Sequence, residues 1–264
     1  MNRRDFLIIS VGTALSGCDF FNSNHDGSHK NIRFIIASDG HYGEEITDYK
    51  KNYSVFVNAV NEFNKNNKVD FCVINGDIIH NDNKYFQPAK KQLDSLVMKY
   101  FVSKGNHDAA TPEEWVKIWG YPMDFDFTLG NNAFLILSTS DISGTYMCPD
   151  HSWLSNKLKE YKSKENIFIF MHINPVAQTH FAVECEQILS LLSEHKNVKA
   201  VFNGHDHDHD EILIKNNIPF VFDGHIGGSW GTDYHGFRVV EVNQDNTIFT
   251  YMMNPTQKIN PSVL

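Results

Sequence analysis

The stretch VKAVFNGHDHDHD, residues 198–210, places three histidines at alternate positions and an aspartate directly after each one. Imidazole nitrogens and carboxylate oxygens are ligands that Mn, Fe and Zn accept, and short histidine-rich tracts can bind metal. Alternating acids and histidines beyond a strand can also form an ordinary polar loop. This stretch alone therefore leaves two alternatives open, a metal site or a solvated charge run.

The same residue types recur after other apolar runs of the chain. Five runs that resemble buried strands each end in Asp, Asn or His, often beside a glycine. The groups are Asp39-Gly40-His41, Gly76-Asp77, Gly105-Asn106-His107-Asp108, His172 and Gly204-His205-Asp206-His207. In open α/β sheets the carboxyl ends of the strands form the ligand crevice, and glycine lets the backbone turn sharply there. One such end is ordinary turn chemistry, but five in one chain indicate a shared site.

The elements that must position these residues alternate between strand and helix. Apolar residues at helical spacing predict helices within residues 46–67, 86–99, 151–165 and 181–196. Short apolar runs predict strands at residues 32–38, 69–75, 100–104, 166–171 and 198–203, and a hairpin at 125–139. Later runs at 218–224, 234–243 and 246–254 are typical of antiparallel strands. The pattern predicts one α/β domain with mixed sheets.

Read in chain order, the polar blocks are DGH, GD, GNHD, H and GHDH. This set resembles the calcineurin-like metallophosphoesterases, whose ordered blocks are D-x-H, G-D, G-N-H-D/E, H and G-H-x-H. The resemblance runs from Asp39 to His207, about two thirds of the chain. It implies an α/β fold of two packed mixed β-sheets flanked by helices, an α/β/β/α sandwich.

The resemblance also implies two metal ions that share Asp77 as a bridging ligand. One ion would be held by Asp39, His41, Asp77 and His207, and the other by Asp77, Asn106, His172 and His205. The ions would be divalent or of mixed valence, with Mn, Fe and Zn as the candidates. Two such ions would activate water to hydrolyse a phosphomonoester or a phosphodiester.

Several neighbouring residues receive roles from the same comparison. His107 resembles the family's non-ligand catalytic histidine, and Asp108 would orient its ring. Purple acid phosphatases carry G-D-x-x-Y, whereas this chain has GDIIH, so His80, together with His41 in the first motif, argues against the tyrosine-bound iron type. His80 is expected beside a ligand, and a role as an additional ligand is the alternative. His180 and His225 are expected near the site. His209 is expected in contact with a ligand or with solvent, and Asp206, Asp208 and Asp210 as loop residues.

Competing functions are weighed by the order of the motifs. A metallo-β-lactamase-type H-x-H-x-D-H needs Asp at position 209 and His at 210, where this chain has His209 and Asp210. Amidohydrolases carry H-x-H near their first strand, not near a late one. A non-catalytic metal-binding lipoprotein on the same fold stays open as an alternative, although the pair His107 and Asp108 argues for catalysis.

The N-terminal residues resemble an export signal rather than part of the fold. Arg3 and Arg4 precede a short apolar run, as in a twin-arginine signal, and a Sec signal is the alternative. LSGC at residues 15–18 resembles a bacterial lipobox. We therefore expect a signal peptide over 1–17, lipid on Cys18 and a flexible tether over 18–30. The protein would be a membrane-anchored lipoprotein of the bacterial cell envelope, facing the periplasm or the exterior.

Composition and cysteines bound the remaining expectations. The 264 residues are 41% apolar with a net charge of -9, so the composition lacks the excess of basic residues that is typical of nucleic-acid-binding proteins, and no nucleic-acid scaffold is expected. The partner expected instead is a phosphorylated substrate, bound by a catalytic domain over residues 31–254 that precedes a tail over 255–264.

Cys72 is expected as a buried thiol, and a Cys148–Cys185 bridge is possible. Substrate specificity would lie in loops such as 108–124 and 174–182.

Overall fold

The computed structural model describes residues 31–264. The expected signal peptide over 1–17, the lipidated Cys18 and the tether over 18–30 lie outside these residues. Within residues 31–264, no helix is both long and apolar enough to span a membrane.

Two six-stranded sheets form the centre of the molecule. The first has the order β12-β11-β10-β1-β2-β3, with β1, β2 and β3 parallel and β10 antiparallel to β1. Its strands are β1 (Ile32–Ala37), β2 (Phe71–Asn75), β3 (Lys99–Ser103), β10 (Phe237–Val242), β11 (Ile248–Asn254) and β12 (Gln257–Val263).

The second sheet has the order β4-β5-β6-β7-β9-β8. Its four central strands are parallel, and an antiparallel strand closes each edge. Its strands are β4 (Phe125–Leu129), β5 (Asn132–Leu137), β6 (Asn166–Met171), β7 (Val198–Asn203), β8 (Ile212–Lys215) and β9 (Ile218–Phe222).

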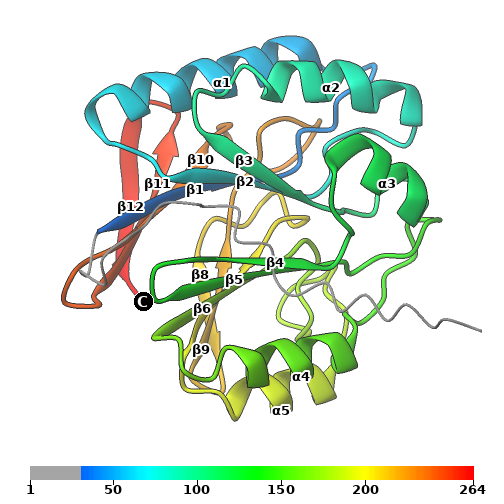
Figure 1. Ribbon diagram of the computed structural model, residues 1–264. Coiled ribbons are helices and arrows are strands. Elements are labelled where there is room, and N and C mark those ends of the chain that lie inside the picture. Colours follow the sequence, from blue (N-terminus) through cyan, green and yellow to red (C-terminus); the bar gives the residue numbers. More distant parts are fainter. Residues whose placement is uncertain (1–30) are drawn as a thin grey trace, which may run out of the picture.

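Helices cover the outer faces of both sheets, which gives four layers (Figure 1). Helices α1, α2 and α3 lie over the first sheet, and α4 and α5 lie over the second. Their bounds are α1 (Tyr49–Asn66), α2 (Phe86–Leu93), α3 (Pro112–Trp119), α4 (His151–Glu160) and α5 (Glu186–Ser193), with a short 3₁₀ helix at Asn83–Tyr85. The two packed mixed sheets flanked by helices confirm the expected fold.

The layer between the sheets is rich in phenylalanine. Phe34 of β1 stacks on Phe71 of β2 and meets Phe134, Phe168 and Phe202 of the second sheet edge to face. All five rings are fully buried. Because side chains alternate along a strand, the residues between these phenylalanines point outward and pack under the helices. The sheets are therefore held face to face, with their loops fixed relative to one another.

Some boundaries differ from the sequence expectations. Residues 257–263, expected as a tail, form β12, whose backbone pairs with β11 at the sheet edge; its mostly exposed side chains give no periodic apolar signal. The strand at 218–222 joins β7 in parallel in the second sheet, because pairing depends on long-range packing. The helix expected from residue 181 begins only at Glu186, directly after Cys185.

Candidate metal centre

The two sheets bring the carboxyl ends of their parallel strands to one place. Backbone hydrogen bonds tie these ends together, from Asp39 N to Gly76 O, from His41 N to Asp77 O, and from Gly204 N to His172 O. The last bond joins the ends of β6 and β7, and the first two join the ends of β1 and β2. Between the sheets, His205 N donates to Asp39 Oδ2 at 2.9 Å, so the polar residues after the strands of both sheets meet, as the sequence predicts.

The backbone at this place is strained. Four of the predicted ligands have positive φ angles, which are uncommon for residues other than glycine. They are Asp39 (56°), His41 (42°), Asp77 (50°) and His205 (68°). Residues with side chains adopt this left-handed region infrequently, and such strain concentrates at functional sites. The surrounding sheets hold these turns, so each side chain is aimed inward at a cost in local conformational energy.

Asp39, His41 and His207 form the first group of donors, and all three are buried. Asp39 Oδ1 lies 3.1 Å from His207 Nε2 and 3.9 Å from His41 Nε2. The two imidazole Nε2 atoms are 3.1 Å apart. Two nitrogens that bind one cation at about 2.1 Å and roughly a right angle would have about this separation.

Asp77, His172 and His205 form the second group, and they are buried as well. Asp77 Oδ2 lies 3.2 Å from His172 Nε2 and 3.7 Å from His41 Nε2 of the first group. Asp77 therefore lies between the two groups, where a bridging carboxylate is expected. Asn106 belongs to the same edge, because the residues on either side of it, Gly105 and His107, both pack against Asp77.

Hydrogen bonds outside the groups fix which ring nitrogen is free. His172 donates from Nδ1 to the backbone oxygen of Asn75 at 2.7 Å, and His207 donates from Nδ1 to that of Trp230 at 3.1 Å. Each ring then presents a lone pair at Nε2 to a carboxylate oxygen, which is repulsive unless a proton or a metal cation lies between them. This backbone support is typical of metal-binding histidines.

The pKa values show that the site needs positive charge. Burial acts to lower the pKa of His172, but the charges of Asp77 and Asp39 outweigh it and raise this pKa to about 10. Burial acts to raise the pKa of Asp77, yet the cationic His172 holds that pKa well below its usual range. His41 and His205 lose their protons readily, because burial lowers their pKa values to about 3 and about 4. Two carboxylates and two neutral imidazoles are a donor set for divalent cations.

Buried polar atoms without hydrogen-bond partners also indicate that this site needs cations. Among the described residues, four of the predicted ligands have a buried atom without a hydrogen-bond partner: Asp39 Oδ1, Asn106 Oδ1, His172 Nε2 and His205 Nε2. A buried polar atom without a partner costs stability, so native proteins leave few of them. Divalent cations at this place would satisfy all four atoms. The residues present thus fit the metals that the sequence indicates.

The expected role of Asp108 as the partner of the His107 ring is wrong. Its fully buried carboxylate accepts hydrogen bonds from Ile79 N and Gly105 N at 3.0 Å and 2.9 Å. It therefore fixes the turn that carries the GNHD motif. Its pKa is raised to about 7, first by burial and then by the charge of Asp77. The ring of His107 instead donates from Nδ1 to Asn81 Oδ1 at 2.9 Å, a contact that the sequence does not reveal.

His80, His209 and His225 lie where the sequence places them. His80 contacts His41 through their Nδ1 atoms at 3.2 Å and stacks on the ring of His107. His225 stacks on His207, which puts its glycine-rich loop at the site. His209 is paired with Glu211 away from the donor groups.

Residues 198–210 thus contain both a segment of predicted metal ligands and a solvated charge run. His205 and His207 point into the site, whereas Asp208, His209 and Asp210 form a polar loop. Asp206 is buried and accepts a hydrogen bond from Thr179. It therefore stabilises the loop and does not orient a metal-binding histidine.

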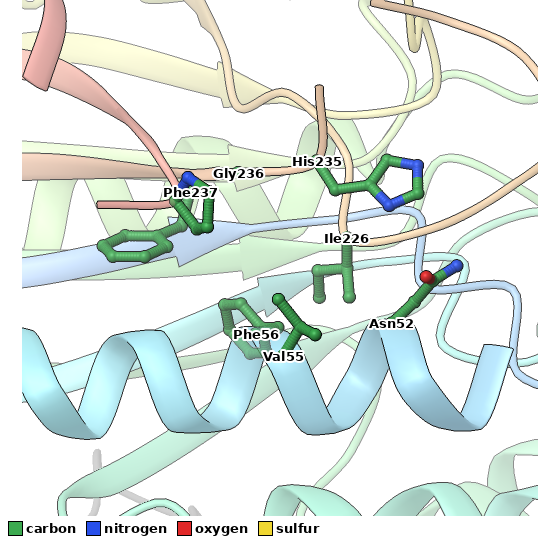
Figure 2. Close-up of a pocket in the computed structure, with 8 residues that line it drawn as sticks. Asn52, Val55, Phe56, Ile226, His235, Gly236 and Phe237 are labelled. Atoms are coloured by element: carbon green, nitrogen blue, oxygen red, sulfur yellow. The ribbon is translucent and has the colours of Figure 1, made fainter. Parts of the chain in front are cut away.

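A separate cavity of about 160 Å³ lies between α1 and the start of β10 (Figure 2). Its residues are Asn52, Val55, Phe56, Ile226, His235, Gly236, Phe237 and Pro255. The lining is mainly apolar, and His235 is its one titratable side chain. It has no converging carboxylates, so it does not suit phosphoryl chemistry.

A family model described as calcineurin-like phosphoesterase matches residues 32–209. The chain belongs to the calcineurin-like phosphoesterase family. This match spans both donor groups, so the chain is a phosphoesterase by family, and the family comprises hydrolases that use divalent metals.

Named relatives agree with this assignment. The serine/threonine-protein phosphatase CPPED1 of Mus musculus is 28% identical over 226 residues, covering 74% of this chain and 70% of the relative. CPPED1 of Homo sapiens is 27% identical over the same length and with the same coverage.

Solved structures share the calcineurin-like phosphoesterase fold. A dimetal phosphatase of Danio rerio has a TM-score of 0.71 at 14% identity, covering 88% of this chain and 98% of that one. A Plasmodium structure described as GAP50, the anchor in the inner membrane complex, has a TM-score of 0.67 at 18% identity, covering 89% and 88%. At these identities the likeness shows the fold alone, and function must come from the site.

Proposed function

We propose that the chain hydrolyses phosphoric esters with two bound divalent or mixed-valence cations of Mn, Fe or Zn. The observation that carries this proposal is the pair of donor groups, whose buried lone pairs converge with Asp77 between them. Asp39, His41, Asp77 and His207 would hold one cation. Asp77, Asn106, His172 and His205 would hold the other. When bound, such a pair acidifies water toward a pKa of about 7 and offsets negative charge on the phosphoryl oxygens.

The protein's own residues supply orientation and a proton. Asn75 and Trp230 accept from Nδ1 of His172 and His207 through their backbone oxygens, which orients both rings so that Nε2 is the atom that would bind a cation. His107, whose Nδ1–H is held by Asn81, carries its second proton at Nε2 when it is protonated. That proton would pass to the leaving oxygen as the ester bond breaks.

The substrate is proposed only as a class. The same arrangement suits a phosphomonoester or a phosphodiester, since both present phosphoryl oxygens to the donor groups. The relatives' name makes phosphoserine and phosphothreonine peptides the first monoesters to test.

The test is hydrolysis of a chromogenic phosphodiester by the full chain with added Mn²⁺. Asp77→Asn should reduce turnover by more than about 100-fold, because both donor groups lose their shared carboxylate. Asp245→Asn, at an exposed loop position, is the matched control and should keep full activity. Equal turnover by the wild type and Asp77→Asn would refute the proposal.

A non-catalytic metal-binding lipoprotein is the alternative. A Plasmodium neighbour described as an anchor shares the fold, which favours considering it. His107 lies outside the two proposed ligand sets yet is oriented by Asn81, which argues against this alternative because a structural metal site needs no such pair. Mn²⁺ binding without turnover of mono- or diesters would support this alternative.

We also propose that the protein is exported and anchored by lipid on Cys18 to a membrane of the bacterial cell envelope. The sequence of residues 1–18 supports this through its paired arginines and LSGC motif. Cys18→Ala should abolish incorporation of radiolabelled palmitate and release the protein from the membrane fraction. A reporter fused to residues 1–30 and exported equally well without the twin-arginine system would assign export to Sec.

A further inference from the structure

Three partly exposed aromatic side chains lie against histidines of the two donor groups. Tyr146, Phe181 and Trp230 are 39%, 39% and 44% exposed. We call these three residues the aromatic rim. The rings of Tyr146 and Phe181 contact the imidazole of His205 with centroids 4.9 Å and 5.9 Å apart. Trp230 stacks in parallel on His207 at 4.4 Å, and Phe181 meets Trp230 edge to face at 5.7 Å.

The loop that carries Tyr146 is fixed at its base. The ammonium group of Lys104 is fully buried and donates hydrogen bonds to Ser140 O, Ser140 Oγ and Asp141 O. Further along, Gly144 has a φ of +84° and passes so close to Asn106 that a Cβ would lie 2.5 Å from its backbone oxygen. The loop therefore packs directly over a predicted ligand.

A disulfide joins this loop to the segment that carries Phe181. Cys148 and Cys185 are bonded, so the bridge that the sequence left open is formed. Cys148 lies two residues after Tyr146, and Cys185 lies four residues after Phe181. An isolated β-bridge between Val176 and Glu184 closes the second segment on itself. Both rings are thus held in place beside His205.

We propose that the aromatic rim binds a flat aromatic ring in the organic part of the substrate. This inference rests on the proposed phosphoesterase function. A phosphoryl group that reaches His205 and His207 must carry its organic substituent past the rings that contact those two imidazoles. Exposed aromatic groups beside a site mark a ligand surface, and aromatic rings pack best on other rings in offset or edge-to-face geometry.

A flat ring fits the rim better than a flexible alkyl chain does. The three rings are rigid, Tyr146 and Phe181 sit on anchored segments, and Phe181 meets Trp230 at an interplanar angle of 64°, so the rim presents planar faces and edges at a steep angle. A planar group can contact such faces without losing internal rotations, whereas an alkyl chain must give up several on binding.

The test measures binding, which does not depend on turnover. Phenyl-, cyclohexyl- and methylphosphonate have carbon–phosphorus bonds that a phosphoesterase does not cleave. Each is titrated calorimetrically into the Mn²⁺-loaded full chain. We expect phenylphosphonate to bind about tenfold more tightly than cyclohexylphosphonate, which is more apolar but not flat. Phe181→Leu and Tyr146→Leu should each reduce this preference to below about threefold.

Ile214→Ala is the matched control, because Ile214 is an exposed apolar residue on β8 outside the rim. It should leave the preference unchanged. Equal affinity for phenyl- and cyclohexylphosphonate, or a preference that survives both leucine variants, would overturn the proposal. Competition by adenosine monophosphate and by phosphotyrosine then separates the two sources of a flat ring, a nucleobase or an aryl group.

Turnover of p-nitrophenyl monoesters and diesters by the same preparations separates the two proposals. A phenyl preference without any turnover would support the rim and contradict the phosphoesterase function. Turnover without a phenyl preference would support the function and contradict the rim.

Discussion

His107 donates a hydrogen bond from Nδ1 to the side-chain oxygen of Asn81 at 2.9 Å, although the two residues are 26 positions apart. Asn81 follows GDIIH and has a positive φ of 64°. The turn after β2 thus orients the histidine that follows β3. Because the oxygen of Asn81 accepts one proton of the ring, the other nitrogen of His107 is left for the proton transfer that the proposed function assigns to it.

This relationship predicts the effect of Asn81→Ala. His107→Ala should reduce kcat by about 10²- to 10⁴-fold, the usual contribution of general acid catalysis. Asn81→Ala should cause a smaller loss, about tenfold, with little change in KM, because the ring remains but is no longer held. Asn81→Asp should retain more activity than Asn81→Ala, since its oxygen still accepts from Nδ1. Steady-state kinetics and the pH profile of kcat measure this, and full activity of Asn81→Ala would contradict it.

Metal binding should stabilise the folded protein. Chelation removes the cations that would pair with the buried oxygen and nitrogen atoms of the two donor groups, so the Tm should fall when metal is removed. Mn²⁺ in about a thousandfold excess over its Kd should restore about 4 kcal/mol. Asp77→Asn should lose most of this gain and Asp245→Asn none of it, as measured by calorimetry. A Tm that does not respond to Mn²⁺ in the wild type would count against the centre.

Two glycines allow backbone strain to be separated from contact with the site. Gly76 and Gly120 have φ of +89° and +86°, so alanine is strained at both. A Cβ on Gly76 would lie 2.4 Å from His172 Nδ1, whereas a Cβ on Gly120 meets nothing within 4 Å. Both variants should lose about 1 kcal/mol of stability through strain. Only Gly76→Ala should also lose Mn²⁺ affinity, and equal affinity in the two variants would contradict this.

The Cys148–Cys185 disulfide closes a loop with a sequence separation of 37 residues. Loop-closure entropy predicts that its loss lowers the free energy of unfolding by about 3–4 kcal/mol. Replacing both cysteines by serine should give this result in urea denaturation. Cys72→Ser tests the buried free thiol separately. If the disulfide variant unfolds at the same urea concentration as the wild type, the loop is held by other contacts.

His235 should make the stability of the protein depend on pH. Burial, followed by the charges of His225 and His207, lowers its pKa from 6.5 to about 4. Between these pH values the unfolded chain binds a proton that the folded chain does not. This contribution is therefore present above pH 6.5 and is lost as the pH falls toward 4.

The Tm of His235→Gln should fall less between pH 7 and pH 4.5 than that of the wild type. His151→Gln, at an exposed histidine on α4, is the control and should follow the wild type. Parallel Tm curves for the wild type and His235→Gln would show that His235 does not contribute.

Much of the site could be predicted because each donor lies directly after a buried strand. Asp39, Asp77 and His205 are recognisable from the apolar run before them and the glycine beside them. Asn81 and Lys104 could not be found in this way, because their partners come from other strand ends. The role expected for Asp108 failed for a similar reason, since adjacency in sequence does not decide which backbone groups a buried carboxylate must satisfy. Phe181 lies in the predicted specificity loop 174–182, whereas Tyr146 and Trp230 lie outside both predicted loops.

The sequence by itself determined the fold class, the order of the motifs and the chemical nature of the donors, because strand periodicity and residue type are local properties. The tertiary structure decided the rest. Packing of the phenylalanine-rich faces sets the distance between the two sheets, and with it the meeting of Asp77 with His172. It also decided the disulfide, the partner of His107 and the position of the aromatic rim, because each depends on contacts between segments far apart in the chain.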